Sequence, residues 1–264
     1  MDFSAIDWQR PWLSHLRELG CRLAVSRDWK AAANSIAGER GLKNAADIPI
    51  LFVPQDALPK STGYEAHISG TGQVPTRDNL HDFFNALIWL HFPATKRTLN
   101  QLQSQEIDRQ PGASLRGRQR DAATLFDENA ALFISRDAGM TELLKQRAWH
   151  RLLFSETYRF HDNCKVILFG HALIEKLVHP YKSITAHVWT LSSDDSCEDD
   201  ISGSWLSRMD ERLATDIARG FVSSDFCHLP VLGVPGWWVG QDHDFYADTS
   251  VFRLPSARKS GSLG

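Results

Sequence analysis

The sequence has few cysteines, and none of them lie at the spacing of a metal-binding pair. Its four cysteines, Cys21, Cys164, Cys197 and Cys227, are widely separated and form no C-x-x-C motif. A zinc ribbon needs such pairs, and a disulfide framework needs a denser set in a shorter chain. We therefore predict reduced thiols and expect neither of these two classes.

The sequence also lacks an excess of charge of either sign. Its net charge is -3 and its pI is about 6.4, so no overall attraction to nucleic acid or to anionic membranes is expected. No apolar run approaches the roughly 20 residues that span a bilayer. The segment MDFSAIDWQRPWL has no basic stretch followed by an apolar one. We predict a cytoplasmic protein without a membrane or nucleic-acid partner.

Familiar nucleotide and hydrolase signatures are missing as well. The sequence contains no G-x-x-x-x-G-K-[ST], G-x-G-x-x-G or G-x-S-x-G. What it does contain is ample material for a core, since 42% of its 264 residues are hydrophobic and nine are Trp. We see neither an internal repeat nor a linker. The sequence predicts one domain over 1–264, with an acidic mobile loop near 192–203 and a loose tail at 256–264.

The stretch 163–179, NCKVILFGHALIEKLVH, would have almost no solvent-facing side as a helix. At roughly 100° per residue its apolar side chains cover nearly the whole circumference, which predicts a buried central helix. His171 and Glu175 are one turn apart, away from the narrow polar strip. They should be buried together. A carboxylate in such a place must be paired, ligated or protonated, because an isolated buried charge costs several kcal/mol or more.

A second helix is predicted from about Asp78 to Phe92, and Pro93 should open the next one, which carries Lys96. On the polar arc of the first helix lie His81, Asn85 and Trp89. A large aromatic ring is seldom left on a purely solvated face. We therefore expect substrate or more protein to cover this arc.

Strand patterns are short and scattered. Segments with apolar runs or alternation fall within 48–70, 124–134 and 184–191, and a turn is expected at Asp127-Glu128-Asn129. Strands and helices are interleaved without regular βαβ alternation. The sequence predicts an α+β domain that is mainly helical, with a small, mainly antiparallel sheet packed on the central helix.

The spacing of His171 and Glu175 would allow both side chains to reach one metal ion. His81 on the neighbouring helix or His187 on a predicted strand could supply a third ligand, and Asp127 or Glu128 a carboxylate. Histidine and carboxylate ligands suit zinc, manganese or iron, and such a metal could activate water. This interpretation predicts a divalent metal cofactor.

Other interpretations use the same residues without a metal. Glu175 with a raised pKa could act as a general acid or base oriented by His171, with His81, Asn85 and Asp127 converging on them. The predicted substrate is small and anionic. The residues expected to bind it are Arg116, Arg120, Lys96, Lys182 and Trp89.

Two further alternatives are not catalytic. Arg116 and Arg120 belong to a segment, 109–120, that could equally be a solvated basic loop. The chain could be a binding or scaffolding protein, and His171 and Glu175 could be an internal hydrogen-bonded pair that fixes helix packing. The sequence leaves these alternatives open, together with the oligomeric state.

Several stretches resemble a known family. They are GYEAHISGTGQVPTRDNLHDFFNALIWLHFPATKRTLN, RGRQRDAATLFDENAALFIS, LFGHALIEKLVHPYKSITAHVW and LPVLGVPGWW with FYADTSVFR. Together they resemble the bacterial family DUF3025, a domain of unknown function. The resemblance spans about Leu51 to Arg253 and implies a single domain. It implies no reaction, cofactor or catalytic residue.

Overall fold

The secondary structure alternates between helices and two small sheets. The computed structural model describes residues 1–104, 114–193 and 203–254. The α-helices are α1 (Arg17–Ala24), α2 (Trp29–Glu39), α3 (Tyr64–Thr71), α4 (Leu80–His91), α5 (Pro93–Ser104), α6 (Ser114–Asn129), α7 (Ala138–Lys145), α8 (Thr157–Asn163), α9 (His171–Lys176), α10 (Gly203–Ile217) and α11 (His243–Ala247). The strands are β1 (Leu51–Pro54), β2 (Gln73–Thr76), β3 (Ala130–Ser135), β4 (Cys164–Leu168), β5 (Thr185–Ser192) and β6 (Cys227–Pro230). The α+β class, mainly helical, is confirmed.

The larger sheet has the strand order β4-β3-β5-β6. Its two central strands are parallel, and each outer strand is antiparallel to its neighbour. Every residue of β3 is buried, as is typical of a strand covered on both faces. The second sheet pairs β1 and β2 in parallel. The predicted antiparallel pairing therefore applies to the outer strands of the larger sheet.

Helices α4 and α5 form where the sequence predicts them. The α4 N-cap is Asn79, whose side chain accepts a hydrogen bond from the backbone N–H of Asp82 at 2.8 Å. Phe92 ends the helix and Pro93 begins α5, since proline fits the first turn of a helix. Trp89 is 2% exposed, so protein covers its end of the polar arc of α4, while His81 and Asn85 on the same arc line a cavity.

The predicted central helix over 163–179 is wrong. Residues Cys164–Leu168 form β4, which pairs with β3, and only His171–Lys176 are helical as α9. An apolar run on all sides fits a strand buried in a sheet as well as a buried helix, and periodicity alone does not distinguish them. Gly170 marks the junction, where strand turns into helix.

Two other predicted strands are helices. The segment 124–129, expected to be a strand and a turn, is the end of α6, and 64–71, expected to alternate as a strand, is α3. In α6 the buried Ala122, Ala123 and Phe126 follow helical spacing. The predicted basic loop at 109–120 is helical from Ser114 onward. These corrections place Asp127 and Glu128 in the last turn of a helix.

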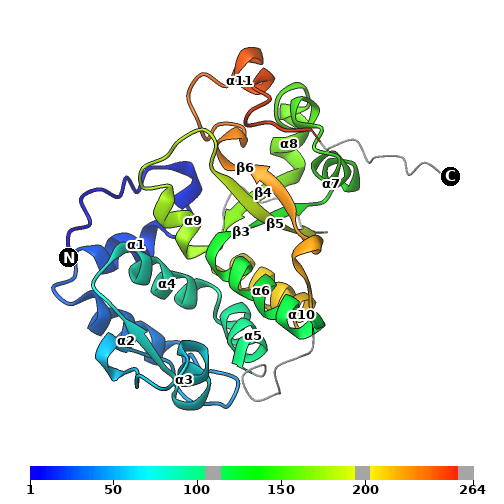
Figure 1. The fold of residues 1–264 in the computed structure, drawn as a ribbon. Coiled ribbons are helices and arrows are strands. Elements are labelled where there is room, and N and C mark those ends of the chain that lie inside the picture. Colours follow the sequence, from blue (N-terminus) through cyan, green and yellow to red (C-terminus); the bar gives the residue numbers. More distant parts are fainter. Residues whose placement is uncertain (105–113, 194–202, 255–264) are drawn as a thin grey trace.

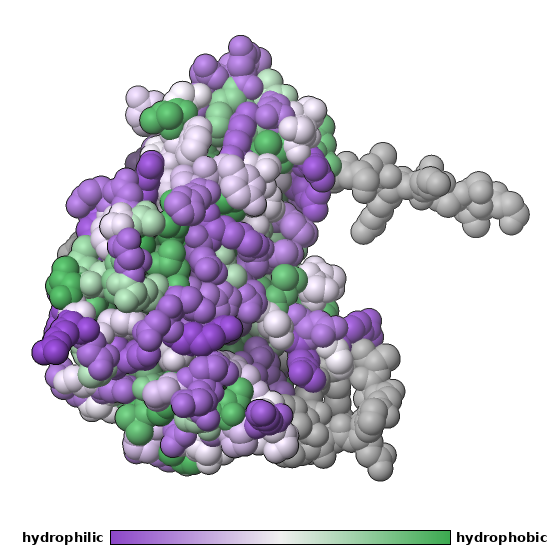
Figure 2. Space-filling model, turned by 60° about the vertical axis from the view of Figure 1, so that its left-hand side comes forward, coloured by the Kyte–Doolittle hydropathy of each residue, from purple (hydrophilic) through white to green (hydrophobic). Residues whose placement is uncertain are grey.

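The elements enclose one cluster of buried apolar residues that extends from Ile6 to Phe252. In Figure 1, α1 to α5 and the β1-β2 sheet lie below the four-stranded sheet, and α6 and α10 lie between that sheet and α5. On the face drawn in Figure 2, hydrophilic residues predominate and smaller hydrophobic groups lie among them. No helix in the described ranges is long and apolar enough to cross a membrane. The predicted loop at 192–203 and tail at 256–264 lie mostly outside these ranges.

Candidate functional site

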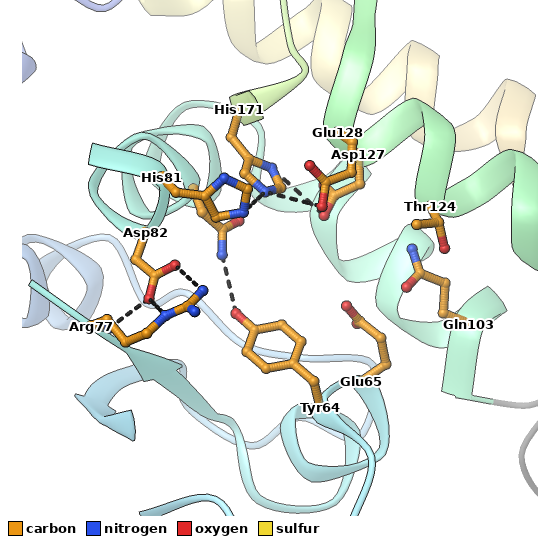
Figure 3. Close-up of a pocket in the computed structure, with 11 residues that line it drawn as sticks. Tyr64, Glu65, Arg77, His81, Asp82, Gln103, Thr124, Asp127, Glu128 and His171 are labelled. Atoms are coloured by element: carbon orange, nitrogen blue, oxygen red, sulfur yellow. Dashed lines mark hydrogen bonds and ion pairs between the residues drawn. The ribbon is translucent and has the colours of Figure 1, made fainter. Parts of the chain in front are cut away.

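A cavity of about 190 Å³ lies where α3, α4, α6 and α9 meet. Figure 3 shows its polar side chains, which come from these helices, from α5 (Gln103) and from the segment between β2 and α4 (Arg77). The residues that line it are Tyr64, Glu65, Arg77, His81, Asp82, Asn85, Gln103, Thr124, Asp127, Glu128 and His171. Four of the five residues that the sequence predicts as catalytic, His81, Asn85, Asp127 and His171, are among them.

The two histidines lie next to each other on one side of the cavity. His81 lies in the first turn of α4 and His171 is the first residue of α9, and their Nε2 atoms are 3.1 Å apart. Nδ1 of His81 is 3.0 Å from Oε2 of Glu175. The predicted direct pair of His171 and Glu175 is therefore wrong, because His81 lies between them. The Glu175 side chain is 39% exposed rather than buried, because α9 is a short helix at the surface of the cavity.

Glu128 completes a group of three possible metal ligands. Its Oε1 is 3.8 Å from Nε2 of His171, and the ligand atoms of His81, Glu128 and His171 all lie within 4.8 Å of one another. Zinc–nitrogen bonds of 2.0–2.1 Å separate two bound nitrogens by about 2.9 to 3.4 Å for angles of 90° to 109°. The two Nε2 atoms are already at this separation.

His171 carries a second indication of a metal site. It is 4% exposed, and its Nδ1 is buried without a hydrogen-bond partner. The nearest carboxylate oxygen, Oδ2 of Asp127, is 3.9 Å away. Burial lowers the pKa of His171 to about 4, against the opposing charge of Asp127, so the ring is neutral at pH 7. A neutral imidazole is the form that binds metals.

Asp127 belongs to a buried network of hydrogen bonds next to the histidines. The Lys96 ammonium donates to Oδ1 of Asp127 at 2.6 Å and to Oδ1 of Asn85 at 2.8 Å. It lies 5.3 Å from the centre of the Trp89 ring, which is a cation–π distance. Burial works to raise the pKa of Asp127, but Lys96 and His171 together outweigh it and lower that pKa. Asp127 is therefore a carboxylate near neutral pH.

Tyr64 and Glu65, in the first turn of α3, point into the cavity from the side opposite the histidines (Figure 3). Burial raises the pKa of the Glu65 carboxyl, and it raises that of the Tyr64 hydroxyl well above its ordinary value. Burial also raises the pKa of Glu128. Acids whose pKa is raised are common where protons are exchanged.

Several predicted site residues lie elsewhere. His187, a predicted metal ligand, is on β5, where its Nδ1 accepts a hydrogen bond from Nδ2 of Asn129 at 3.0 Å. Lys182 is 2.8 Å from Asp248. Trp89 is packed in the core and does not line the cavity. Arg116 lies within α6, and its side chain is outside the described part of the structure.

Arg120 does lie near the cavity. It lines a wider hollow of about 500 Å³ on α6, which shares Thr124 and Glu128 with the cavity. The Arg120 side chain is exposed, and its charge acts to lower the pKa of Glu65. Among the predicted anion-binding residues whose side chains the structure describes, Arg120 is the one placed where a bound molecule could reach both it and the histidines.

The sequence analysis did not predict six of the lining residues: Tyr64, Glu65, Arg77, Asp82, Gln103 and Thr124. A helical interpretation of 64–71 would have placed Tyr64 and Glu65 in a first turn, and the helical spacing of Ala122, Ala123 and Phe126 would have put Thr124 on the other face of α6. No local pattern shows that α3 and α6 meet. Their meeting depends on packing of both helices against α5.

Gly170 fixes the position of His171, and a side chain there should disturb the site. A Cβ atom at this residue would lie 2.4 Å from the backbone nitrogen of Ala130 and 2.5 Å from that of Asn129. Backbone must shift to make room, so Gly170→Ala should lower the free energy of unfolding by about 1 to 3 kcal/mol. Gly38→Ala, where no atom lies within 4 Å, is the matched control and should cost nothing. Urea unfolding of both variants measures this, and equal stabilities would contradict the close approach of α9 to β3.

The fold and the cavity define an α+β protein with a partly buried histidine–carboxylate centre where several helices meet. A family model described as a protein of unknown function, DUF3025, matches residues 50–256. The chain belongs to this family, as its sequence suggests. Comparison with curated proteins and with solved structures found no match.

Proposed function

We propose that the cavity is the active site of a metal-dependent hydrolase. Nε2 of His81, Nε2 of His171 and the carboxylate of Glu128 would bind a divalent ion such as zinc, manganese or iron. The observation that carries this proposal is the 3.1 Å separation of the two Nε2 atoms beside an acidic side chain. The bound ion would lower the pKa of a water molecule and polarise the oxygen of a substrate.

The remaining carboxylates would orient the ligands. Glu175 accepts the Nδ1–H of His81, which leaves the lone pair on Nε2 free for a metal. Asp127 lies beside Nδ1 of His171, the atom without a hydrogen-bond partner. Once Nε2 of His171 binds the metal, Nδ1 would carry the proton and donate a hydrogen bond to Asp127. Histidine ligands in metal sites usually have a partner of this kind on their second nitrogen.

Glu65 is placed to exchange a proton with substrate. It lines the cavity opposite the ligands, and its raised pKa brings it nearer the range in which a carboxyl can act as a general acid. The predicted anionic group of the substrate would lie at the mouth on Arg120. Lys96 and Arg77 are not available for it, because each is paired with a carboxylate of the cavity wall.

A chelator experiment tests the proposal. Purified protein should hydrolyse at least one member of a panel of chromogenic phosphate, carboxyl-ester and anilide substrates. The rate should fall at least a hundredfold after dialysis against a chelator, and zinc, manganese or iron should restore it. Glu128→Gln should lose the metal-dependent rate, and Glu211→Gln, on the exposed face of α10, should keep it.

The alternative is a binding protein in which the histidines and acids serve only packing. It predicts no hydrolysis of any panel member by the metal-loaded protein. A third outcome, hydrolysis that survives chelation and depends on Glu65 or Glu175, would support the metal-free carboxylate mechanism instead.

Arg120→Gln should raise KM for anionic substrates several-fold and leave kcat nearly unchanged.

A further inference from the structure

Three side chains form a hydrogen-bonded chain that ends in the cavity. The Lys96 ammonium donates to Oδ1 of Asn85 at 2.8 Å, and Nδ2 of Asn85 donates to the Tyr64 hydroxyl oxygen at 3.1 Å. Lys96 and Asn85 are buried, at 4% and 6% exposure. None of these contacts involves a metal ligand directly, so the chain is a separate feature of the cavity wall.

The ammonium sets the direction of every bond in the chain. An ammonium group has donors only, so the oxygen of the Asn85 amide must face Lys96 and its NH₂ must face Tyr64. The reversed amide would place two donors against each other in a buried position. Tyr64 therefore receives a hydrogen bond on its oxygen and keeps its own proton to donate.

The Tyr64 proton is directed at the reaction space. Among the residues that the structure describes, Tyr64 donates no hydrogen bond to another group. Its hydroxyl lies on the cavity wall and points toward the side occupied by the two histidines (Figure 3). Burial raises its pKa, which keeps the proton on the oxygen at neutral pH.

We infer that Tyr64 is a catalytic hydrogen-bond donor to the substrate oxygen on which negative charge develops, and that Asn85 and Lys96 position it. This inference rests on the proposed function, since the charge would develop while the same oxygen, or its neighbour, is bound by the metal. The substrate class is thus one with a carbonyl or phosphoryl oxygen at the scissile centre. A donor placed beforehand at such an oxygen stabilises the transition state without reorganisation.

The test uses acetohydroxamate, whose two oxygens can bind a metal and accept a hydrogen bond. Calorimetric titration of zinc-loaded protein should give an affinity that falls about tenfold to a hundredfold in Tyr64→Phe, the range for a hydrogen bond to a charged group. Zinc affinity should stay as in wild type, and Tm should fall by only a few degrees, because the buried NH₂ of Asn85 loses its acceptor. A purely structural tyrosine would leave the probe affinity of the folded, zinc-loaded protein unchanged. Tyr158→Phe, at a side chain that is 89% exposed, is the matched control and should bind the probe normally.

Asn85→Asp tests the direction of the chain. A carboxylate of nearly the same shape would accept from both Lys96 and Tyr64, which would turn the tyrosine proton away from the cavity. This variant should lose probe affinity although Tyr64 is present. In a Tyr64→Phe protein, Asn85→Asp should change probe affinity only through its added charge. The losses of probe affinity in the two single variants should therefore not add in the double variant.

The outcomes separate the two proposals. Zinc binding with unchanged probe affinity in Tyr64→Phe would overturn the inference and leave the metal site standing. Fully additive losses in the double variant would show that Asn85 does not act through Tyr64. Absence of zinc binding in wild type would overturn the proposed function and this inference with it.

Discussion

Lys96→Met should lower the free energy of unfolding by about 3 to 5 kcal/mol, because it leaves the Asp127 carboxylate buried without its cation. Asp127 is 9% exposed and Lys96 is 4% exposed. The two side chains form an ion pair at 2.6 Å, in which each charge neutralises the other. At about 2 to 4 °C per kcal/mol for domains of roughly this size, Tm should fall by about 6 to 20 °C. Thermal melts of metal-free protein measure the change.

Lys30→Met is a matched control for this prediction. Lys30 also pairs with an aspartate, Asp78, at 3.0 Å and lies 5.9 Å from the Trp29 ring, but the Asp78 side chain is 61% exposed. An exposed pair contributes at most about 1 kcal/mol. The double variant Lys96→Met with Asp127→Leu, which removes both charges, should regain much of the lost stability. Equal effects of Lys96→Met and Lys30→Met would contradict the buried network.

Removal of either histidine from the centre should abolish tight metal binding. His81→Ala and His171→Ala each leave at most one imidazole and one carboxylate, too few protein ligands for a typical zinc site. Glu175→Gln keeps both rings and removes only the charge that holds Nδ1 of His81. Its zinc affinity should fall about 10-fold to 100-fold, the usual cost of losing such a partner.

Competition of each variant with a chromogenic zinc chelator measures these affinities. His161→Ala, at an exposed position on α8, is the control and should bind zinc as wild type does. Unchanged affinity in Glu175→Gln would show that the contact between His81 and Glu175 serves packing alone. Retained affinity in both histidine variants would mean that the metal binds elsewhere.

Local patterns were sufficient for the parts of the site that lie on α4 and α5. The amphipathic spacing of α4, the Asn79 region as its start and Pro93 as the start of the next helix placed His81, Asn85 and Lys96 on neighbouring helices. Their convergence with Asp127 and His171 followed from the chemistry of buried polar groups, which must find partners.

Local patterns failed where distant segments decide the structure. Cys164–Leu168 is a strand because β3 lies beside it, and β3 comes about 30 residues earlier in the chain. His171 and Glu175 are one helical turn apart in α9, as predicted, but no local pattern shows that a side chain from α4 enters between them. The strand ends before Gly170, and α9 starts afresh at a position where His81 from α4 comes between them.

A zinc titration decides whether His81 and His171 bind a metal ion. Chelator-treated wild type and the double variant His81→Ala with His171→Ala are titrated with zinc, and metal content after desalting is determined by elemental analysis. The account predicts one tightly bound zinc ion per wild-type chain and none in the double variant. Wild type that takes up no zinc, manganese or iron, or a double variant that binds as much as wild type, would contradict it.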